Sequence, residues 1–238
     1  MLIIAHRSGP GVFPEQSILS AREALKNGAD IVEMDVRETK DGVPVICHDD
    51  DTGRMFGVPG DVADWSLREF MAMRHVGDRA FAPHSLEDVL ACGVRPLLLH
   101  CKQTGEEQTE RICALLMRYR AAETTTLGVQ DPSCAPVVRR CAPGCRILAF
   151  MPRPEQIEEF GAMEIDYIRL WEHWLTPERV GRVHATGKKL WIMANDPAQG
   201  GCGYTTAQAL RSFAALGAHA VLLNDIPWAA AHWPGGQA

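Results

Sequence analysis

Short apolar runs alternate with helix-forming segments along nearly the whole chain. The runs are rich in β-branched residues, and several are apolar at almost every position, as is typical of parallel strands that are covered on both faces. This alternation of strand and helix predicts a parallel α/β sheet. The runs are residues 2–5, 31–36, 43–47, 97–101, 125–129, 146–151, 165–170, 190–194 and 218–223.

Helix signals occupy the segments between these runs. Ser85-x-x-Asp88 and Thr104-x-x-Glu107 have the form of capping boxes, and Thr176 precedes a proline that suits a first helical turn. Glycines stand where helices should end before the next strand, and these are Gly28, Gly187 and Gly217.

One of the runs is surplus to an eight-stranded barrel. The turn Lys40-Asp41-Gly42 between the second and third runs is too short for a crossover helix, so the third run is expected to return as a hairpin. The other runs predict a (β/α)8 TIM barrel, formed by residues 1–238 as a single domain, with a short hairpin or cap insertion after the second strand. A doubly wound open sheet is the alternative, but no GxGxxG or GxxxxGKS/T motif follows the first run.

Charge and cysteine content narrow the classes of function. A net charge of −6 argues against nucleic acid or an anionic membrane surface as the main partner, because both attract a basic field. No N-terminal signal and no membrane-spanning segment is expected, since no apolar run approaches the roughly 18 residues of a membrane helix. The eight cysteines include no CxxC pair, and most of them are expected to be small buried residues of a protein in a reducing compartment. The cytoplasm is the default, and a mature secreted form is the alternative. Oligomeric state has no signal in the sequence.

Two carboxylates on one predicted strand give the strongest chemical signal. Glu33 and Asp35 lie two residues apart, so both face the same side of the strand. Inside a barrel such charge is costly unless a cation or an ion pair neutralises it, and hard divalent cations prefer oxygen ligands. We therefore expect a metal site here.

Other polar side chains stand at the predicted strand ends, where TIM barrels carry their active sites. Cleavage of a phosphodiester needs a base, an acid and positive charge on the non-bridging oxygens. Two histidines, one divalent cation and an Arg–Lys pair would fill these roles, so the set suits a phosphodiester. A lone histidine at a strand end is more often merely hydrogen-bonded, and this interpretation therefore depends on the whole set. Its further members are His6, Arg7, His48, Asp49, His100, Lys102, Asp131, Asn195 and Asp225.

The order of these residues resembles the signature of the glycerophosphodiester phosphodiesterase family. The similar segments are residues 3–7, 14–17, 28–36 and 39–49, with looser similarity at 85–90, 191–195 and 224–227. The resemblance implies a barrel enzyme that hydrolyses small-molecule glycerophosphodiesters to an alcohol and glycerol 3-phosphate, with one divalent cation. It implies that His6 and His48 are the acid–base pair, Glu33 and Asp35 are metal ligands, Arg7 and Lys102 hold the phosphate, and Glu15 is a supporting carboxylate near the metal.

The residue at the position of the family's third metal ligand differs in this chain. The family has a glutamate in a Glu-x-Lys strand end, where this chain has His100-Cys101-Lys102. The change removes a negative charge and offers a softer nitrogen donor, so the expected outcomes are a weaker Mg2+ or Ca2+ site, a shift to Mn2+ or Zn2+, or no metal. Asp131 stands where the family usually has serine and could restore the carboxylate, and Gln16 replaces the usual asparagine.

Three functions stay open at this point. Retention of the acid–base, carboxylate and phosphate residues favours an active phosphodiesterase, whereas His100 favours a catalytically weak or silent relative that binds a phosphorylated ligand. A lyase that releases a cyclic phosphate is the third.

Two further segments have predicted structural roles. Residues 49–83 are expected to form a small cap over the barrel mouth or a covering helix with an apolar face. Trp228 and Trp233 are expected to pack on the outside of the barrel.

Overall fold

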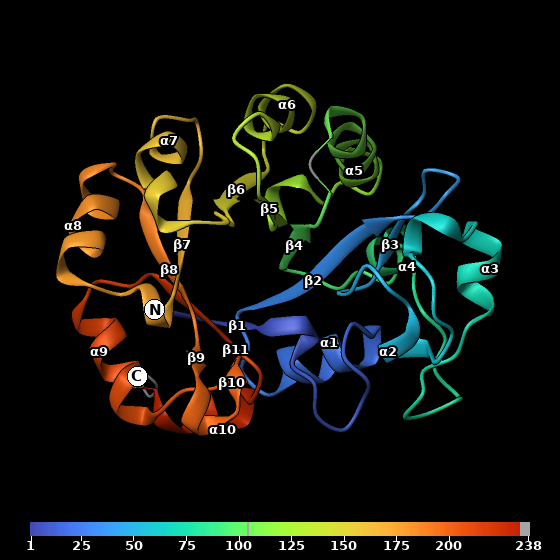
Figure 1. Cartoon of the computed structure of the whole chain (residues 1–238), viewed down its shortest axis with the longest axis horizontal. Helices are drawn as coiled ribbons and strands as arrows, with labels where there is room; N and C mark the ends of the chain where they lie inside the picture. The colour runs from blue at the N-terminus through green and yellow to red at the C-terminus, as the bar shows by residue number, and fades with distance from the viewer. Residues whose placement is uncertain (104, 234–238) are drawn as a thin grey trace.

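Parallel strands close into a barrel. The computed structural model describes residues 1–103 and 105–233. Within these ranges the barrel strands follow the order β1-β11-β8-β7-β6-β5-β4-β2, and β1 pairs with β2 to close the ring. Figure 1 shows helices around the outside of this ring, so the predicted (β/α)8 TIM barrel is confirmed. The strands are β1 Leu2–Ala5, β2 Ile31–Glu38, β4 Leu97–Cys101, β5 Thr125–Val129, β6 Arg146–Ala149, β7 Tyr167–Trp171, β8 Lys189–Met193 and β11 Ala220–Leu223.

Both faces of each barrel strand are covered, which explains the nearly continuous apolar runs. Inward-facing side chains, among them Ile4, Leu98 and Trp191, pack together inside the barrel. Their neighbours along the strands, such as Leu97 and Leu99, belong to the core between the barrel and its helices. Toward the carboxyl ends of the strands the inward positions become polar, and this end holds the candidate site.

Helices connect successive strands and cover the barrel. Among the described residues no helix is long and apolar enough to cross a membrane. The α-helices are α1 Ile18–Lys26, α2 Gly53–Phe56, α3 Leu67–Ala72, α4 Leu86–Ala91, α5 Glu106–Arg118, α6 Cys134–Cys141, α7 Ile157–Gly161, α8 Pro177–Ala185, α9 Ala207–Ala215 and α10 Ile226–His232. Short 3-10 helices are η1 His6–Ser8, η2 Val62–Asp64, η3 Ala122–Thr124, η4 Pro154–Gln156, η5 Glu172–Trp174 and η6 Pro197–Gln199.

Most of the predicted helix ends are confirmed. Ser85 and Asp88 form a reciprocal capping box at the start of α4, and Thr176 caps α8 through its side chain. The capping box predicted at Thr104 involves a residue outside the described ranges, and α5 begins at Glu106. The three predicted helix-ending glycines have the positive φ that favours glycine: Gly28, Gly187 and Gly217.

The predicted hairpin insertion follows the second strand. β3 (Pro44–Ile46) pairs antiparallel with β2, and α2, η2 and α3 come after it. This segment has a small core of its own, in which Phe56 and Phe70 meet edge to face with ring centroids 5.5 Å apart. Figure 1 shows α2 and α3 beside the ring of strands. Val45 of β3 belongs to the same small core, so the apolar faces of α2 and α3 cover β3. This agrees with the prediction of a covering helix with an apolar face.

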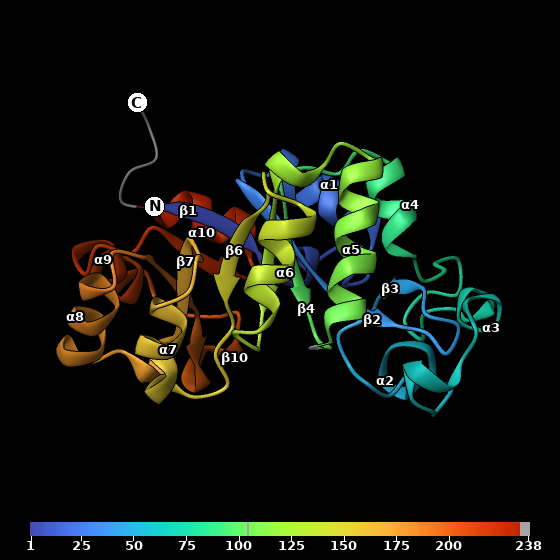
Figure 2. The same cartoon turned by 90° about the horizontal axis from the view of Figure 1, so that it is seen from above.

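A two-stranded ribbon after β8 was not predicted. β9 (Asn195–Asp196) and β10 (Gly201–Cys202) pair antiparallel, and each is too short to show a period in the sequence. Figure 2 shows β10 and α2 on the same side of the molecule, the side toward which the barrel strands point. The predicted packing of Trp228 and Trp233 against the outer core is confirmed.

Candidate active site

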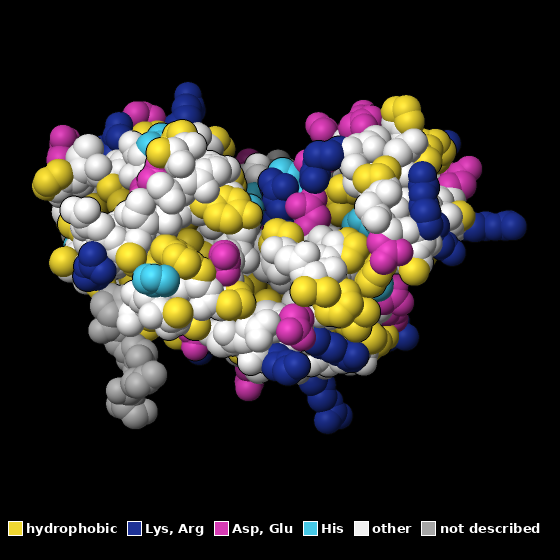
Figure 3. Space-filling view, turned by 90° about the horizontal axis from the view of Figure 1, so that it is seen from below, with side chains coloured by type: hydrophobic (Ala, Val, Ile, Leu, Met, Phe, Trp, Pro, Cys, Tyr) yellow, Lys and Arg dark blue, Asp and Glu magenta, His cyan; other side chains and the backbone are white. Residues whose placement is uncertain are grey.

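A polar cavity of about 250 Å³ opens at the carboxyl ends of the barrel strands. Figure 3 shows the molecule hollowed between two lobes on this side, with basic, acidic and histidine side chains gathered in the recess. The structure brings together most of the predicted residues in the wall of this cavity: His6, Arg7, Glu33, Asp35, His48, His100 and Lys102.

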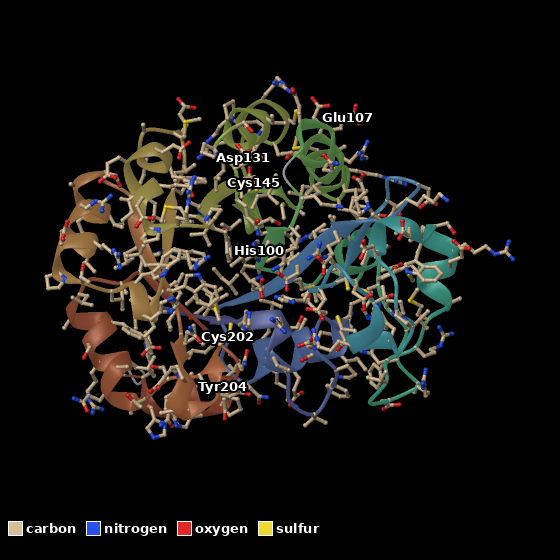
Figure 4. All side chains as sticks on the ribbon, in the orientation of Figure 1. His100, Glu107, Asp131, Cys145, Cys202 and Tyr204 are labelled. Carbon is tan, nitrogen blue, oxygen red and sulfur yellow. The ribbon has the colours of Figure 1, made fainter. Side chains whose placement is uncertain are left out.

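Glu33, Asp35 and His100 form a compact buried cluster on the adjacent strands β2 and β4. Asp35 is in register with His100, and each of the three residues has a ligand atom within 4.8 Å of the others. His100 Nδ1 lies 3.0 Å from Asp35 Oδ1 and 3.9 Å from Glu33 Oε1, and Lys102 Nζ lies 2.9 Å from the same Asp35 oxygen. Figure 4 places His100 inside the ring of strands.

The two carboxyl groups of this cluster have opposite pKa shifts. Burial raises the pKa of Glu33 well above its usual range, and the negative charge of Asp35 adds to the effect. Burial also opposes ionisation of Asp35, but the His100 imidazole and the Lys102 ammonium outweigh it and hold the pKa of Asp35 well below its usual range. The pair therefore favours one ionised carboxylate at Asp35, and an added cation would favour ionisation of both.

Two residues with left-handed backbone hold the carboxylates in place. Arg7 (φ 49°) donates its backbone N–H to Glu33 Oε2 at 2.6 Å. Gln16 (φ 61°) donates Nε2–H to Asp35 Oδ2 at 2.5 Å, and its Oε1 accepts the Asp35 backbone N–H at 3.1 Å. Because this conformation is unfavourable for residues with a Cβ, these bonds offset a local strain. Gln16 is thus a positioning residue for Asp35.

His6 presents a neutral imidazole to the cavity. Its Nδ1 lies 2.7 Å from Asn224 Oδ1, so Nδ1 carries the proton and Nε2 keeps a lone pair. Burial, together with the nearby Arg7 guanidinium, lowers the pKa of His6 to about 4. At neutral pH the Nε2 atom is therefore able to accept a proton.

His48 is oriented in the same manner by a carboxylate. Its Nδ1 lies 2.6 Å from Asp49 Oδ1, and its Nε2 accepts a hydrogen bond from Arg7 Nη2 at 2.7 Å. Asp49 is itself paired with Arg54 of α2. Burial lowers the pKa of His48, so this imidazole is also neutral at pH 7. In both histidines a side-chain acceptor thus holds Nδ1 and Nε2 keeps the lone pair, which in His48 accepts the hydrogen bond from Arg7.

Glu15 lies at the rim, outside the carboxylate cluster. Its two oxygens contact Arg7 Nη1 at 3.4 Å and Arg54 Nη2 at 2.5 Å. Glu15 therefore connects Arg7, which follows β1, to Arg54 of the insertion.

Asp131, Asn195 and Asp225 are predicted residues that the structure does not bring to the cavity wall. Asn195 Nδ2 lies 3.1 Å from His173 Nδ1, and Asp225 caps the start of α10, whereas Asp131 lies beyond β5. Its Oδ1 accepts the backbone N–H of Ser133 at 2.8 Å, beside the start of α6, and Figure 4 shows it set apart from His100. Successive side chains after a strand point to opposite sides, and Gln130 takes the inner position, with its Nε2 2.8 Å from His100 Nε2. This geometry does not support the idea that Asp131 replaces the missing carboxylate.

The far wall of the cavity contains residues that were not predicted. Phe150 follows β6, Arg169 and Trp171 lie on β7, and Cys202 lies on β10 with its Sγ 4.0 Å from His6 Nε2. The sequence did hold a signal for Arg169, because a charged residue at an inward position of an apolar strand needs an explanation as much as Glu33 does.

The donor set of the cluster fits a divalent cation. Asp35 Oδ1 is buried and, although it has ionic neighbours, no described residue gives it a well-aligned hydrogen bond. Two carboxylates and one imidazole suit a cation that accepts nitrogen as well as oxygen. The Gln130 amide nitrogen beside His100 Nε2 donates to that atom, so the imidazole proton is on Nδ1, facing Asp35. Coordination of a cation through Nδ1 would move this proton to Nε2, and Gln130 would then have to turn its amide oxygen toward the ring.

The first part of the chain matches a known family. Residues 6–121 match the model of the Glycerophosphoryl diester phosphodiesterase family. The chain is 28% identical over 151 residues to lysophospholipase D GDPD3 of Mus musculus, and this alignment covers 58% of this chain and 45% of that protein. It is 34% identical over 96 residues to a glycerophosphodiester phosphodiesterase of Bacillus altitudinis, and this alignment covers 40% of this chain and 36% of that protein. The matches thus span less than two thirds of these relatives, and they confirm the predicted resemblance.

Solved structures share the fold over nearly the whole chain. A phosphodiesterase of Oleispira antarctica, in complex with the product sn-glycerol-3-phosphate, superimposes with a TM-score of 0.80 at 18% identity. The alignment covers 98% of this chain and 96% of that one. At this identity the similarity establishes the TIM-barrel fold.

Proposed function

We propose that this chain, a TIM barrel whose residues 6–121 match the glycerophosphoryl diester phosphodiesterase family, hydrolyses glycerophosphodiesters to an alcohol and glycerol 3-phosphate. The observation that carries the proposal is the cavity, in which two neutral imidazoles, His6 and His48, stand beside the cations Arg7 and Lys102. One neutral imidazole can act as the base, the other can act as the acid once it is protonated, and the two cations supply the positive charge that phosphodiester cleavage needs.

Arg7 and Lys102 hold the phosphate of the substrate in this proposal. They follow β1 and β4, the two strands that flank β2 in the ring, so their charges approach the same phosphate from both sides. A guanidinium and an ammonium there stabilise negative charge on the non-bridging oxygens, and burial in the cavity strengthens the interaction.

His6 and His48 move the protons. In the first step the glycerol 2-hydroxyl attacks phosphorus, and the neutral Nε2 of one histidine accepts the hydroxyl proton. The other histidine must be protonated at Nε2 beforehand, a form that the negative charge of the bound phosphodiester stabilises, and it gives this proton to the leaving alkoxide. In the second step water opens the cyclic phosphate with the roles of the histidines reversed. Asn224 and Asp49 keep each ring in the tautomer that presents Nε2 to the reacting groups.

A divalent cation would be held by Glu33, Asp35 and His100, where it would supply further positive charge for the phosphodiester. The imidazole in this set favours Mn2+ or Zn2+ over the Mg2+ or Ca2+ that an all-carboxylate site prefers.

The lyase and the silent relative are the competing functions. In both histidines a side-chain acceptor holds Nδ1 and leaves the lone pair on Nε2, an arrangement that proton transfer needs and that phosphate binding alone does not, and this favours turnover over mere binding. We also propose that residues 1–238 act as one catalytic unit and that the protein is cytoplasmic, since its eight cysteines are all free.

Activity on glycerophosphocholine and glycerophosphoethanolamine tests the proposal. The assay uses protein stripped of metal and then supplied with Mg2+, Ca2+, Mn2+ or Zn2+, and phosphorus NMR separates glycerol 3-phosphate from a cyclic product. His6→Ala and His48→Ala should each lower kcat by about 100-fold or more, while His232→Ala on the exposed face of α10 should not. Folded protein without turnover under every condition contradicts the proposal, and accumulation of a cyclic phosphate identifies a lyase.

A further inference from the structure

Arg169 is a buried cation without a counter-charge. Its side chain lies on the inner face of β7 and lines the cavity, and the residue is 4% exposed. Its Nε and Nη1 atoms are buried without a hydrogen-bond partner, and no carboxylate pairs with it within the described ranges. Burial lowers the pKa of Arg169 to about 9, so the guanidinium is still charged at neutral pH. A charge in this position is costly unless a ligand satisfies it.

Aromatic rings surround this guanidinium. Its Cζ lies 4.5 Å from the centroid of Trp171, 5.0 Å from Phe150 and 5.7 Å from Trp174. Stacking of this kind stabilises the guanidinium and fixes its plane but uses none of its N–H donors in the ring plane. The donors therefore remain available to the cavity.

The position of Arg169 separates it from the groups that would hold the phosphodiester. In the ring, β4, β5 and β6 lie between β2 and β7 on one side, and β1, β11 and β8 lie between them on the other. β7 is thus opposite β2, whose carboxylates lie between Arg7 and Lys102. A substrate whose phosphorus lies at β2 extends across the cavity toward Arg169.

We propose that Arg169 binds an anionic group in the alcohol part of the substrate, so that the preferred glycerophosphodiesters carry a carboxylate or a second phosphate in their head group. The inference rests on the function proposed above and names its substrate class. A bidentate contact to a carboxylate or phosphate would satisfy the donors that the protein leaves unpaired.

Charge complementarity also disfavours a cationic head group. Trimethylammonium groups are recognised by the faces of aromatic rings, but here a guanidinium already stands among the rings of Phe150, Trp171 and Trp174. Replacement of the family's glutamate by His100 removes a further negative charge from the cavity. Both features favour a substrate with more negative charge than glycerophosphocholine.

Glycerophosphoserine and glycerophosphoethanolamine test this inference, because the two esters differ only by the serine carboxylate. In the native chain kcat/KM should be about tenfold or more higher for the serine ester, and Arg169→Gln should lower this ratio by about 10- to 100-fold. Arg169→Met, which keeps the side-chain length against the rings, should do the same. Arg146→Gln, at the exposed start of β6, should keep the native ratio.

Binding measured by titration calorimetry separates failure of this inference from failure of the proposed function. Arg169-dependent preference for the serine ester without turnover supports the subsite and contradicts the phosphodiesterase. Equal loss for both esters in Arg169→Gln would show that the guanidinium holds the diester phosphate itself and overturns the inference. Turnover of both esters with an unchanged ratio in the variants also overturns it.

Discussion

Gly128 on β5 lies directly against the ring of Phe150, and a Cβ at Gly128 would overlap that ring. The missing side chain allows Phe150 to stack on His100, with ring centroids 3.8 Å apart and an interplanar angle of 13°. Phe150 also packs beneath the Arg169 guanidinium. One glycine at an inward position of a strand therefore fixes the arrangement of two cavity walls.

Gly128→Ala is expected to lower the free energy of unfolding by about 1–3 kcal/mol, because the added methyl group forces the Phe150 ring away from His100. Chemical denaturation measures this change. Gly181→Ala, in the middle of α8 with open space around the glycine, should instead stabilise the protein by about 0.5–1 kcal/mol. An equally stable Gly128→Ala variant would show that the ring contact is not tightly packed.

Gln16→Ala is expected to lower kcat/KM by about 10- to 100-fold, because Asp35 loses two hydrogen bonds that fix its carboxylate. Gln16→Asn should recover part of the activity, since asparagine accepts the left-handed backbone more readily. Steady-state kinetics give the measurement, with the exposed Gln208→Ala as the control. If Gln16→Ala and Gln208→Ala behave alike, Gln16 has no positioning role.

His100→Glu is expected to make the protein more dependent on Mg2+ or Ca2+. Three carboxylates in one buried cluster repel each other without a cation, and each tenfold gain in affinity adds about 1.4 kcal/mol of stability at a fixed excess of metal. Thermal unfolding with and without each cation measures the effect. The same metal-induced shift in the native chain and the variant would show that His100 is not a ligand.

His75 in the insertion should make the protein less stable in acid. It is buried, with its ring 4.9 Å from that of Phe56, and burial lowers its pKa below the ordinary value of 6.5. Between the two pKa values the unfolded chain binds more protons than the folded chain, so stability falls as pH falls below about 6.5. His75→Leu should reduce the loss of unfolding free energy between about pH 7.5 and pH 5.5, compared with His232→Leu. Parallel pH profiles for the two variants would argue against this.

The barrel and part of its candidate site could be predicted from the sequence, because these features depend on the local order of residues. The apolar runs and their spacing define the strands, and Lys40-Asp41-Gly42 alone shows that β3 must be a hairpin. Glu33 and Asp35 share a face because strand geometry has a period of two, whatever surrounds them. The resemblance to a family then predicted roles for His6 and His48 from their order in the chain.

Tertiary structure decided which side chains meet across the barrel. Gln130 and Asp131 are the first two residues after β5, but only Gln130 lies on the inner side and reaches His100. Arg169 is an ordinary charged residue until ring closure places β7 opposite β2 and leaves its guanidinium buried without a partner. A sequence pattern determines the face of a residue on its own strand. The partners and the cost of its charge depend on strands that are distant in the chain, because burial and electrostatics are set by the closed barrel.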